Sequence, residues 1–592
     1  MYWASFFWAN WGLRVAGPQQ VISESQQPQT HIGDHSATRP NIIFILTDDQ
    51  DLHLDSLNYL PYVQKHLLQQ GTFYKRHFCT IALCCPSRVS LWTGKAAHNT
   101  NVTDVSPPYG GYPKFVSQGL NDNFLPIWLQ DAGYNTYYTG KLFNTHTVYN
   151  YDSPHVNGFT GSDFLLDPFT YQYLNSTYQR NKDPPVRYEG EHTTDILAEK
   201  AYGFLEDAIA DEKPFFLTIA PVAPHSNVKF EALPEPGGKF NAEFEPPIPA
   251  DRHVHLFPDA KVPRTDNFNP EEPSGVNWVR KLPRQSPENV AFNDHFYRAR
   301  LRALQGVDEL VDGVISRLEN HGILENTYII YSSDNGYHIG QHRLQPGKEC
   351  GFEEDINIPL IIRGPGVPKN ATTGIVTTHT DLAPTILDLV GVHPRADFDG
   401  EAIPTTKEAI KAATLDRHEH VNVEYWGFAA GEGKSWGQER LHWNNTYKAL
   451  RVIGKSYGFY YSVWCNNEHE LYDLDNDPGQ LKNLLSHHSG PAQTLLGHSL
   501  HKVAARLDAL LFVLKSCKGR TCIEPWEALH PAGNVRNLHH ALSPKFDHFY
   551  EVQQKRVEYQ RCEAGYIVDA EGPQFEEDGI VFRHGSHWSH WV

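Results

Sequence analysis

A cysteine followed closely by an arginine is the pattern in this chain with the clearest chemical potential. The stretch from Cys84 to Gly94 reads Cys-Cys-Pro-Ser-Arg-Val-Ser-Leu-Trp-Thr-Gly. Pro86 favours the first turn of a helix, because its φ is fixed near the helical value and it has no N–H to leave unpaired. We therefore predict a helix from Pro86, with Cys84 just ahead of it, where free backbone N–H groups attract anions. Arg88, one turn further on, can point back to the same place.

An arbitrary cysteine four residues before an arginine is usually a buried thiol beside a surface cation. The longer spelling Cys-x-Pro-Ser-Arg is rarer, and in a chain of this composition it is expected by chance about one time in a thousand. This rarity favours a reactive site over the ordinary interpretation.

Two apolar runs end in acidic tips. Residues 41–47 read as a buried strand of a parallel sheet and lead into Asp48 and Asp49, and residues 328–333 lead into Asp334 and Asn335. A single Asp-Asp pair is more often a solvated turn, but a second such tip favours a cation at one sheet edge, where open α/β sheets bind ligands. Three carboxylates and one amide oxygen suit Ca²⁺ or Mg²⁺ better than zinc.

Basic side chains lie beside further predicted strands. Lys141 follows the run 134–138, His225 follows the run 215–219, and Lys348 precedes the run 359–363. A lone lysine or histidine in a loop is usually just solvated, so spacing alone assigns these residues no role.

The stretch from Cys84 to Gly94 resembles the signature of the sulfatases, Cys-x-Pro-Ser-Arg followed by Leu-x-Thr-Gly. In that family the cysteine is oxidised by a formylglycine-generating enzyme to formylglycine, whose hydrate is the nucleophile. The resemblance implies that Cys84, and not Cys85, is the modified residue. It also implies Ca²⁺, in preference to Mg²⁺, with Asp48, Asp49, Cys84, Asp334 and Asn335 as ligands and Arg88, Lys141, His225 and Lys348 as catalytic groups.

One position departs from the commonest family pattern. Many sulfatases read Gly-Lys-x-His, and that histidine is the base that breaks down the sulfated intermediate. Here the chain reads Gly-Lys-Leu-Phe-Asn from Gly140 to Asn144. This spelling is similar to the N-acetylglucosamine-6-sulfatase branch and to related eukaryotic, fungal-type arylsulfatases. His146 and His338 are two alternatives for the missing base.

The resemblance implies hydrolysis of a sulfate monoester, with an aryl sulfate as the first candidate substrate. A sulfatase for a sulfated sugar, such as N-acetylglucosamine-6-sulfate, is an alternative. So is a phosphonate or phosphate monoester hydrolase of the same alkaline-phosphatase-like superfamily, although those enzymes often hold two metals and this sequence has one ligand set. The alternative that is not an enzyme is an inactive binder of sulfated glycans.

The order of predicted elements indicates an α/β fold. Strands alternate with helical patterns at residues 198–209 and 300–319, which predicts a large, mostly parallel mixed sheet sandwiched by helices. By resemblance, the aromatic run 457–464 and the segment 470–474 belong to a smaller C-terminal α+β domain with an antiparallel sheet. We predict a lead-in over 1–39, a catalytic domain over 40–410 with a long irregular insertion at 226–290, and the smaller domain over 411–592.

Composition limits the partners and the compartment. The chain has 592 residues and a net charge of −19, which argues against a nucleic-acid binder. No stretch reaches the ~18 apolar residues of a membrane span, so we predict no transmembrane anchor. Residues 2–13 are apolar but lack a basic start, an atypical signal segment. Secretion is the preferred localisation and the cytoplasm is the alternative.

Two modifications follow from short motifs. Cys517 and Cys522 enclose four residues and predict a local disulfide, with half of a zinc site as the alternative. Glycosylation sequons stand at Asn101, Asn175, Asn370 and Asn444, about the number that chance provides.

Overall fold

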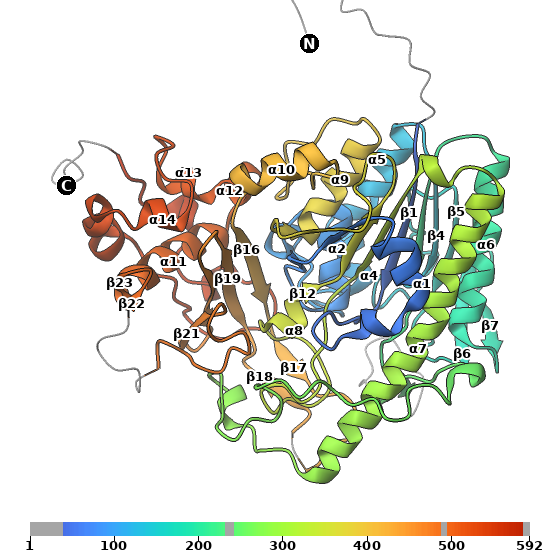
Figure 1. The fold of residues 1–592 in the computed structure, drawn as a ribbon, viewed down its shortest axis with the longest axis horizontal. Coiled ribbons are helices and arrows are strands. Elements are labelled where there is room, and N and C mark those ends of the chain that lie inside the picture. The colour runs from blue at the N-terminus through green and yellow to red at the C-terminus, as the bar shows by residue number, and fades with distance from the viewer. Residues whose placement is uncertain (1–38, 231–241, 438, 487–493, 584–592) are drawn as a thin grey trace, which may run out of the picture. The chain divides into compact units, whose positions relative to one another are not determined.

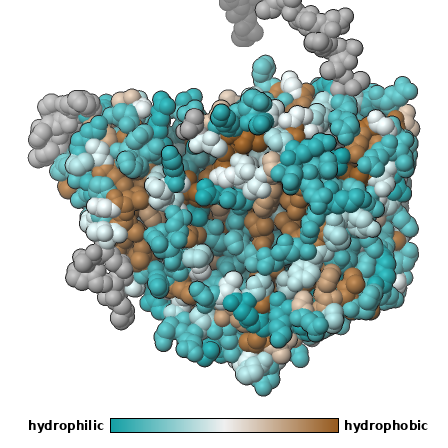
Figure 2. Space-filling model, in the orientation of Figure 1, coloured by the Kyte–Doolittle hydropathy of each residue, from teal (hydrophilic) through white to brown (hydrophobic). Residues whose placement is uncertain are grey.

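The structure is a computed structural model that describes residues 39–230, 242–437, 439–486 and 494–583. The predicted lead-in lies outside these ranges except for Arg39. No helix among the described residues is both long enough and apolar enough to cross a membrane. On the face drawn in Figure 2, hydrophilic residues cover most of the surface and hydrophobic residues form separate, smaller areas.

A ten-stranded mixed sheet is the centre of the larger part of the fold (Figure 1), in the order β14-β2-β13-β11-β1-β8-β4-β5-β6-β7. Its strands are β1 Asn41–Thr47, β2 Thr72–Tyr74, β4 Asn135–Gly140, β5 Gly161–Leu165, β6 Asn175–Arg180, β7 Val186–Glu189, β8 Phe215–Ala220, β11 Thr327–Ser333, β13 Leu360–Arg363 and β14 Ala371–Thr373. The central strands β11, β1, β8, β4 and β5 run parallel, while β13, β6 and β7 pair antiparallel. The predicted mostly parallel sheet is confirmed.

Both faces of this sheet are buried, as the continuous apolar sequence of β1 predicts. Ile42, Phe44 and Leu46 pack into one core cluster, and Ile43 and Ile45 pack into another on the opposite face. The first cluster includes residues of α2 (Cys84–Thr93), α5 (Leu125–Asp131) and α9 (Leu382–Leu389). The second includes residues of α6 (Thr193–Ala210) and α7 (Pro287–Asn320), which lie side by side in Figure 1.

Helix α2 starts two residues earlier than predicted. Cys84 is its first residue rather than a residue ahead of it, and Pro86 still falls within the first turn. The helix ends where Gly94 takes a left-handed φ of 65° and its N–H bonds to the Ser90 carbonyl oxygen. A Cβ at Gly94 would lie 2.6 Å from the Phe398 ring, so only glycine fits there.

The segment 226–290 is not wholly irregular, which corrects our prediction. It contains β9 (Asn227–Phe230), paired antiparallel with β10 (Ala242–Glu245), and its last four residues already belong to α7. The Ser286 side chain accepts a hydrogen bond from the Asn289 N–H and caps that helix. The strands were missed because four residues are too few for a visible alternation of apolar and polar positions.

A four-stranded antiparallel sheet forms the smaller part of the fold, as predicted. Its order is β16 (His420–Tyr425), β19 (Tyr447–Ile453), β20 (Gly458–Trp464) and β21 (His469–Asp473). The apolar side of α11 (Leu500–Leu514) packs against β19 and β20 in one core cluster.

Short elements complete the described part of the chain. The strands are β3 His77–Phe78, β12 Asn357–Ile358, β15 Thr377–Thr378, β17 Phe428–Ala430, β18 Leu441–Trp443, β22 Thr494–Leu495 and β23 His498–Ser499. The helices are α1 Pro61–Val63, α3 Ala97–Thr100, α4 Gly111–Ser117, α8 Glu353–Ile356, α10 Lys407–Asp416, α12 Arg520–Ile523, α13 Pro525–Leu529, α14 Leu538–Ala541 and α15 Phe575–Asp578.

Two disulfides are present among the described residues. Cys517–Cys522 was predicted, and Cys465–Cys562 was not, because its partners are 97 positions apart and sequence alone does not pair distant cysteines. Four free cysteines are buried, Cys84 among them. All four sequon asparagines are at least partly exposed, and their glycosylation stays a prediction.

Candidate active site

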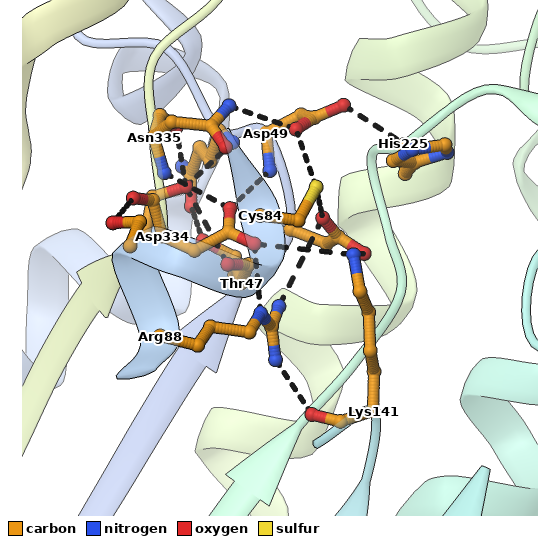
Figure 3. A network of polar contacts seen from close by, with 12 residues as sticks. Thr47, Asp49, Cys84, Arg88, Lys141, His225, Asp334 and Asn335 are labelled. Carbon is orange, nitrogen blue, oxygen red and sulfur yellow. Dashed lines mark hydrogen bonds and ion pairs between the residues drawn. The ribbon is translucent and has the colours of Figure 1, made fainter. Parts of the chain in front are cut away.

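The predicted site residues meet at the carboxyl end of the central parallel strands (Figure 3). Asp48 and Asp49 follow β1, Asp334 and Asn335 follow β11, Lys141 follows β4, and His225 follows β8 after a short loop. Because β1 pairs with β11 on one side and with β8 on the other, segments far apart in sequence end at the same edge. Cys84 and Arg88 reach this edge from α2.

Cys84 lies against both acidic residues that follow β1. Its Sγ is 3.5 Å from Asp48 Oδ1, 3.8 Å from Asp49 Oδ1 and 3.4 Å from Lys348 Nζ. Burial raises the pKa of the Cys84 thiol well above its ordinary value. The unmodified side chain is therefore a neutral thiol at neutral pH and a poor nucleophile.

Each of the three carboxylates has a basic side chain in hydrogen-bond contact, and all six groups are buried. Lys141 Nζ lies 2.6 Å from Asp48 Oδ2, Lys348 Nζ lies 2.6 Å from both oxygens of Asp49, and Arg88 Nε donates to Asp334 Oδ2 at 2.8 Å. The positive charge that an anionic substrate needs is thus local, although the chain as a whole is acidic.

Backbone groups fix the orientation of these side chains. Asp334 Oδ1 accepts hydrogen bonds from the backbone N–H groups of Asp49, at 3.0 Å, and Asn335, at 2.9 Å. Arg88 Nη1 donates to the carbonyl oxygen of Lys141 at 2.6 Å. Asp49 itself has a left-handed φ of 64°, a conformation that is costly for a residue other than glycine and is common at functional sites.

The carboxylates differ in their affinity for a proton. Burial raises the pKa of Asp48 to about 7, against the opposing effect of Lys141. Burial also opposes the charge on Asp49, but Lys348 and His225 keep the pKa of that carboxyl below its ordinary value. For Asp334, Arg88 and Lys141 outweigh burial and hold the pKa well below the usual range.

The oxygen atoms of this cluster fit a hard divalent cation. Asn335 Nδ2 donates at 2.8 Å to Asp49 Oδ1 and at 2.8 Å to the Gly336 carbonyl oxygen, whereas Asn335 Oδ1 is buried and accepts no hydrogen bond from the described residues. Leaving such an acceptor unsatisfied costs about 1–3 kcal/mol. An oxygen-liganded cation such as Ca²⁺ would satisfy it, together with the neighbouring carboxylates.

His225 is the histidine that the fold brings to this cluster. Its Nε2 lies 3.6 Å from Asp49 Oδ2, and its Nδ1 lies 2.8 Å from the Ser226 carbonyl oxygen. Since a carbonyl oxygen only accepts, the neutral ring carries its proton on Nδ1 and presents Nε2 to the cluster. Burial lowers the pKa of His225 to about 4.

Neither of the two alternatives for the missing base belongs to the cluster. His146 packs against the rings of Tyr112 and Phe164, and burial lowers its pKa to about 3. His338 Nδ1 instead lies 2.8 Å from the Asp355 carboxylate. Within the described ranges, neither histidine bonds to Cys84 or to the three acids around it.

Glu432 is a neighbour of the site that sequence reasoning missed. Its Oε2 accepts hydrogen bonds from the Ser226 hydroxyl and, at 2.6 Å, from the Tyr337 hydroxyl, and its Oε1 lies 3.9 Å from Lys348 Nζ. It comes from the segment between β17 and β18, where no motif marks it. Only the packing of that segment against the larger sheet's edge reveals it.

Ser87 and His379 form a hydrogen-bonded pair behind the backbone of Asp334. Ser87 Oγ lies 2.6 Å from the Asp334 carbonyl oxygen and 2.8 Å from His379 Nδ1. Ser87 belongs to the Cys-x-Pro-Ser-Arg spelling, so the motif pointed to it. His379 carried no such signal, because its contact is made across the fold.

The site joins acids, a cysteine at a helix start and several cations, a combination that suits an anionic ester. Similarity to known proteins specifies which ester. Residues 40–392 match the family described as Sulfatase, and residues 340–506 match N-sulphoglucosamine sulphohydrolase, C-terminal. An arylsulfatase of Volvox carteri is 38% identical over 543 residues, covering 86% of this chain and 80% of its own. The N-acetylglucosamine-6-sulfatase of Homo sapiens is 30% identical over 519 residues, covering 82% and 86%. The chain belongs to the sulfatase family and hydrolyses sulfate esters.

The architecture agrees with this assignment. A solved structure in complex with its substrate D-glucosamine-2-N,6-O-disulfate superposes with a TM-score of 0.60 at 22% identity, covering 76% of this chain and 94% of that chain. At this identity the likeness concerns the fold alone. The predicted fold class is confirmed.

Proposed function

We propose that this sulfatase hydrolyses aryl sulfates, with a formylglycine formed from Cys84 and one Ca²⁺ ion held by Asp48, Asp49, Asp334 and Asn335. The observation that carries the proposal is the buried Asn335 Oδ1, an acceptor without a donor among the described residues, beside three carboxylates. A hard cation is the partner that such a set of oxygens lacks.

The balance of charge supports the same assignment. Lys141 and Lys348 form ion pairs with Asp48 and Asp49. With a divalent cation bound to those carboxylates, Lys141 and Lys348 would be free to bind the sulfonyl oxygens of a substrate.

Ca²⁺ and formylglycine would supply what the side chains lack. When present, Ca²⁺ supplies positive charge next to the sulfate group, and formylglycine supplies an oxygen nucleophile in place of a neutral thiol. Arg88 holds the Asp334 carboxylate and the Lys141 backbone in place. Lys348 Nζ is the protonated nitrogen placed to give a proton to the leaving alcohol, and His225 would give one from Nε2 only as the imidazolium.

The choice of an aryl sulfate rests on similarity. The Volvox carteri arylsulfatase shares 38% identity with this chain, against 30% for the human N-acetylglucosamine-6-sulfatase. Because of the second relative, a sulfated hexosamine is the second candidate substrate. The test below therefore includes both an aryl sulfate and a sulfated hexosamine.

We infer that the protein matures in the secretory pathway. Two disulfides among the described residues favour an oxidising compartment. The partner required there is a formylglycine-generating enzyme that acts on Cys84.

Two measurements test the proposed function. The first is a peptide mass map across residues 77–88 on protein made with its own maturation machinery, and we expect the aldehyde at Cys84 and an intact Cys85. The second compares para-nitrophenyl sulfate, phosphate and phosphonate with N-acetylglucosamine-6-sulfate. Preferred turnover of the aryl sulfate supports the proposal, whereas an unmodified Cys84 together with preferred turnover of the phosphonate contradicts it.

A further inference from the structure

We propose that Tyr171 is a further catalytic residue of this site: its hydroxyl donates a hydrogen bond to a sulfonyl oxygen of the substrate, and its ring holds Lys141 and His225 in place. The inference rests on the proposed function and deepens it. Tyr171 lies in the loop between β5 and β6, which carries no motif.

The ring of Tyr171 contacts two of the catalytic groups at once. It stacks on the His225 imidazole with ring centroids 4.1 Å apart and planes inclined by 27°. Lys141 Nζ lies 4.8 Å from the centroid of the same ring, within the range of a cation–π contact. One buried aromatic side chain therefore limits where both the ammonium and the imidazole can lie.

The loop that carries Tyr171 is tied to the segment that carries His225. The Tyr171 carbonyl oxygen accepts a hydrogen bond from the Val228 N–H at 3.1 Å, and the Tyr173 hydroxyl donates to the His225 carbonyl oxygen at 2.8 Å. Both tyrosines are buried. The position of the Tyr171 ring is therefore fixed by the protein before any substrate arrives.

The hydroxyl of Tyr171 is left with a proton to donate. Asn144 Nδ2 donates to Tyr171 Oη at 2.7 Å, so the phenol oxygen acts as an acceptor there. Across the described ranges, Asn144 is the hydroxyl's hydrogen-bond partner, and the hydroxyl's own O–H has no acceptor. A sulfonyl oxygen held by Lys141 would supply that acceptor.

The phenol of Tyr171 is held in its protonated form. Burial raises the pKa of Tyr171 well above its ordinary value, and among ionisable groups Cys84 has the largest further effect, ahead of Asp167 and Asp48. The phenol therefore stays protonated and able to donate.

The packing of Phe143 leaves its neighbour Asn144 as the hydrogen-bond partner of Tyr171. Phe143 turns into the aromatic core, with its ring centroid 4.6 Å from that of Phe115, and it is buried. Asn144 then points to the Tyr171 hydroxyl, and its Oδ1 is buried without a partner among the described residues. The pair offers one free donor and one free acceptor beside Lys141.

Two substitutions separate the hydroxyl from the ring. Tyr171→Phe keeps the stacking and the cation–π contact and removes only the hydroxyl, whereas Tyr171→Leu removes both. The matched control is Tyr178→Phe, a buried tyrosine of β6 whose hydroxyl lies 3.2 Å from the Thr193 carbonyl oxygen. We measure kcat, KM, inhibition by inorganic sulfate and the melting temperature of each variant.

For Tyr171→Phe we expect kcat/KM to fall about 100-fold, mainly through kcat, since one donor to a developing anion has this effect. Inhibition by inorganic sulfate should weaken about tenfold. Tyr171→Leu should lose more of both, and Tyr178→Phe should match the wild type. A Tyr171→Phe enzyme with wild-type kcat/KM, or an equal loss in Tyr178→Phe, overturns the inference.

Failure of the proposed function has a different signature. A wild type that turns over no sulfate ester of the panel contradicts that function whatever Tyr171 does. Calorimetric binding of inorganic sulfate then still tests the hydroxyl: weaker binding by Tyr171→Phe supports the inference, and equal affinity overturns it.

Discussion

Two buried clusters of charge in this protein are built from similar side chains but differ in how completely their polar atoms are satisfied. One is the active-site cluster of Asp48, Asp49 and Asp334 with their three basic partners. The other, the junction cluster, consists of Glu424 on β16, Lys448 on β19 and His98 on α3. It joins the small antiparallel sheet to the helices that follow α2.

In the junction cluster every oxygen of the central carboxylate has donors. Glu424 Oε1 accepts from the His98 backbone N–H at 3.0 Å, and Oε2 lies 2.8 Å from His98 Nδ1 and 2.9 Å from Lys448 Nζ. Burial alone would raise the pKa of Glu424, but His98 and Lys448 lower it to about 2. The cluster is satisfied as it stands and has no need of a ligand.

The active-site cluster has the opposite character. Its amide oxygen at Asn335 lacks a donor among the described residues, and three carboxyl groups share one small volume. Burial of the acids raises the pKa of Asp48 to about 7, while Asp49 and Asp334 stay charged. A buried acceptor without a donor beside clustered acids is typical of a ligand-binding site, whereas a fully hydrogen-bonded ion cluster is typical of a structural contact.

The largest expected effect is on activity, at Cys84. Cys84→Ala should reduce kcat/KM more than about 1,000-fold, because the nucleophile position is lost, with little change in melting temperature. Cys85→Ala is the matched control, since Cys85 is the second residue of α2 and packs into the core, so its loss should leave activity near the wild-type level. Comparable activity losses in the two variants would contradict the assignment of Cys84.

In the junction cluster we expect a substitution to reduce stability and not activity, the opposite of Cys84→Ala. Glu424→Gln removes the carboxylate that is hydrogen-bonded to the buried Lys448 ammonium, with the Glu571 carboxylate 3.7 Å away, and should lower the free energy of unfolding by about 3 kcal/mol. We expect kcat per folded molecule to be unchanged. Denaturant unfolding measures this free energy, with the exposed Glu408→Gln as control. Adding Lys448→Met should recover part of the loss. A fall in kcat without a loss of stability would remove the distinction between the clusters.

Asp49→Asn tests the cation directly. In the wild type, added Ca²⁺ should raise the melting temperature, since a ligand that binds only the folded state stabilises it. The variant should lose most of this shift and at least about 100-fold in activity. The exposed Asp416→Asn is the control. An undiminished Ca²⁺-dependent shift in Asp49→Asn would place the ion elsewhere.

The smallest expected effect is a pH dependence at His98. Burial lowers the pKa of His98, but Glu424 outweighs it and the net pKa is raised above 6.5. The folded protein then holds this proton more tightly than the unfolded one, so the stabilisation is complete below pH 6.5 and is lost as pH rises through the folded pKa.

The slope that one proton contributes is at most about 1.4 kcal/mol per pH unit. Unfolding free energies of the wild type and His98→Gln, measured across neutral and mildly alkaline pH, should converge as the pH rises. A difference that grows with pH would have the wrong sign for this pair.

Much of the site was predictable because its chemistry lies at strand ends and in one short motif. Asp48, Asp49, Asp334 and Asn335 follow apolar runs that could only be buried strands, and parallel strands end at one edge. The boundary of α2 was misplaced by two residues because helix starts depend on local caps. The strands β9 and β10 were too short to show a period.

The sequence by itself predicted the mostly parallel sheet and the acidic residues at its strand ends, since both follow from apolar runs along the chain, and its motif is the basis for proposing Cys84 as the nucleophile position. Tertiary structure alone decided that Tyr171 lies on His225, that Glu432 reaches Lys348 and that Cys465 pairs with Cys562. It also decided that neither His146 nor His338 belongs to the site. These contacts join side chains from distant segments, and no local pattern of residues records which distant surfaces the packing of a core will bring together.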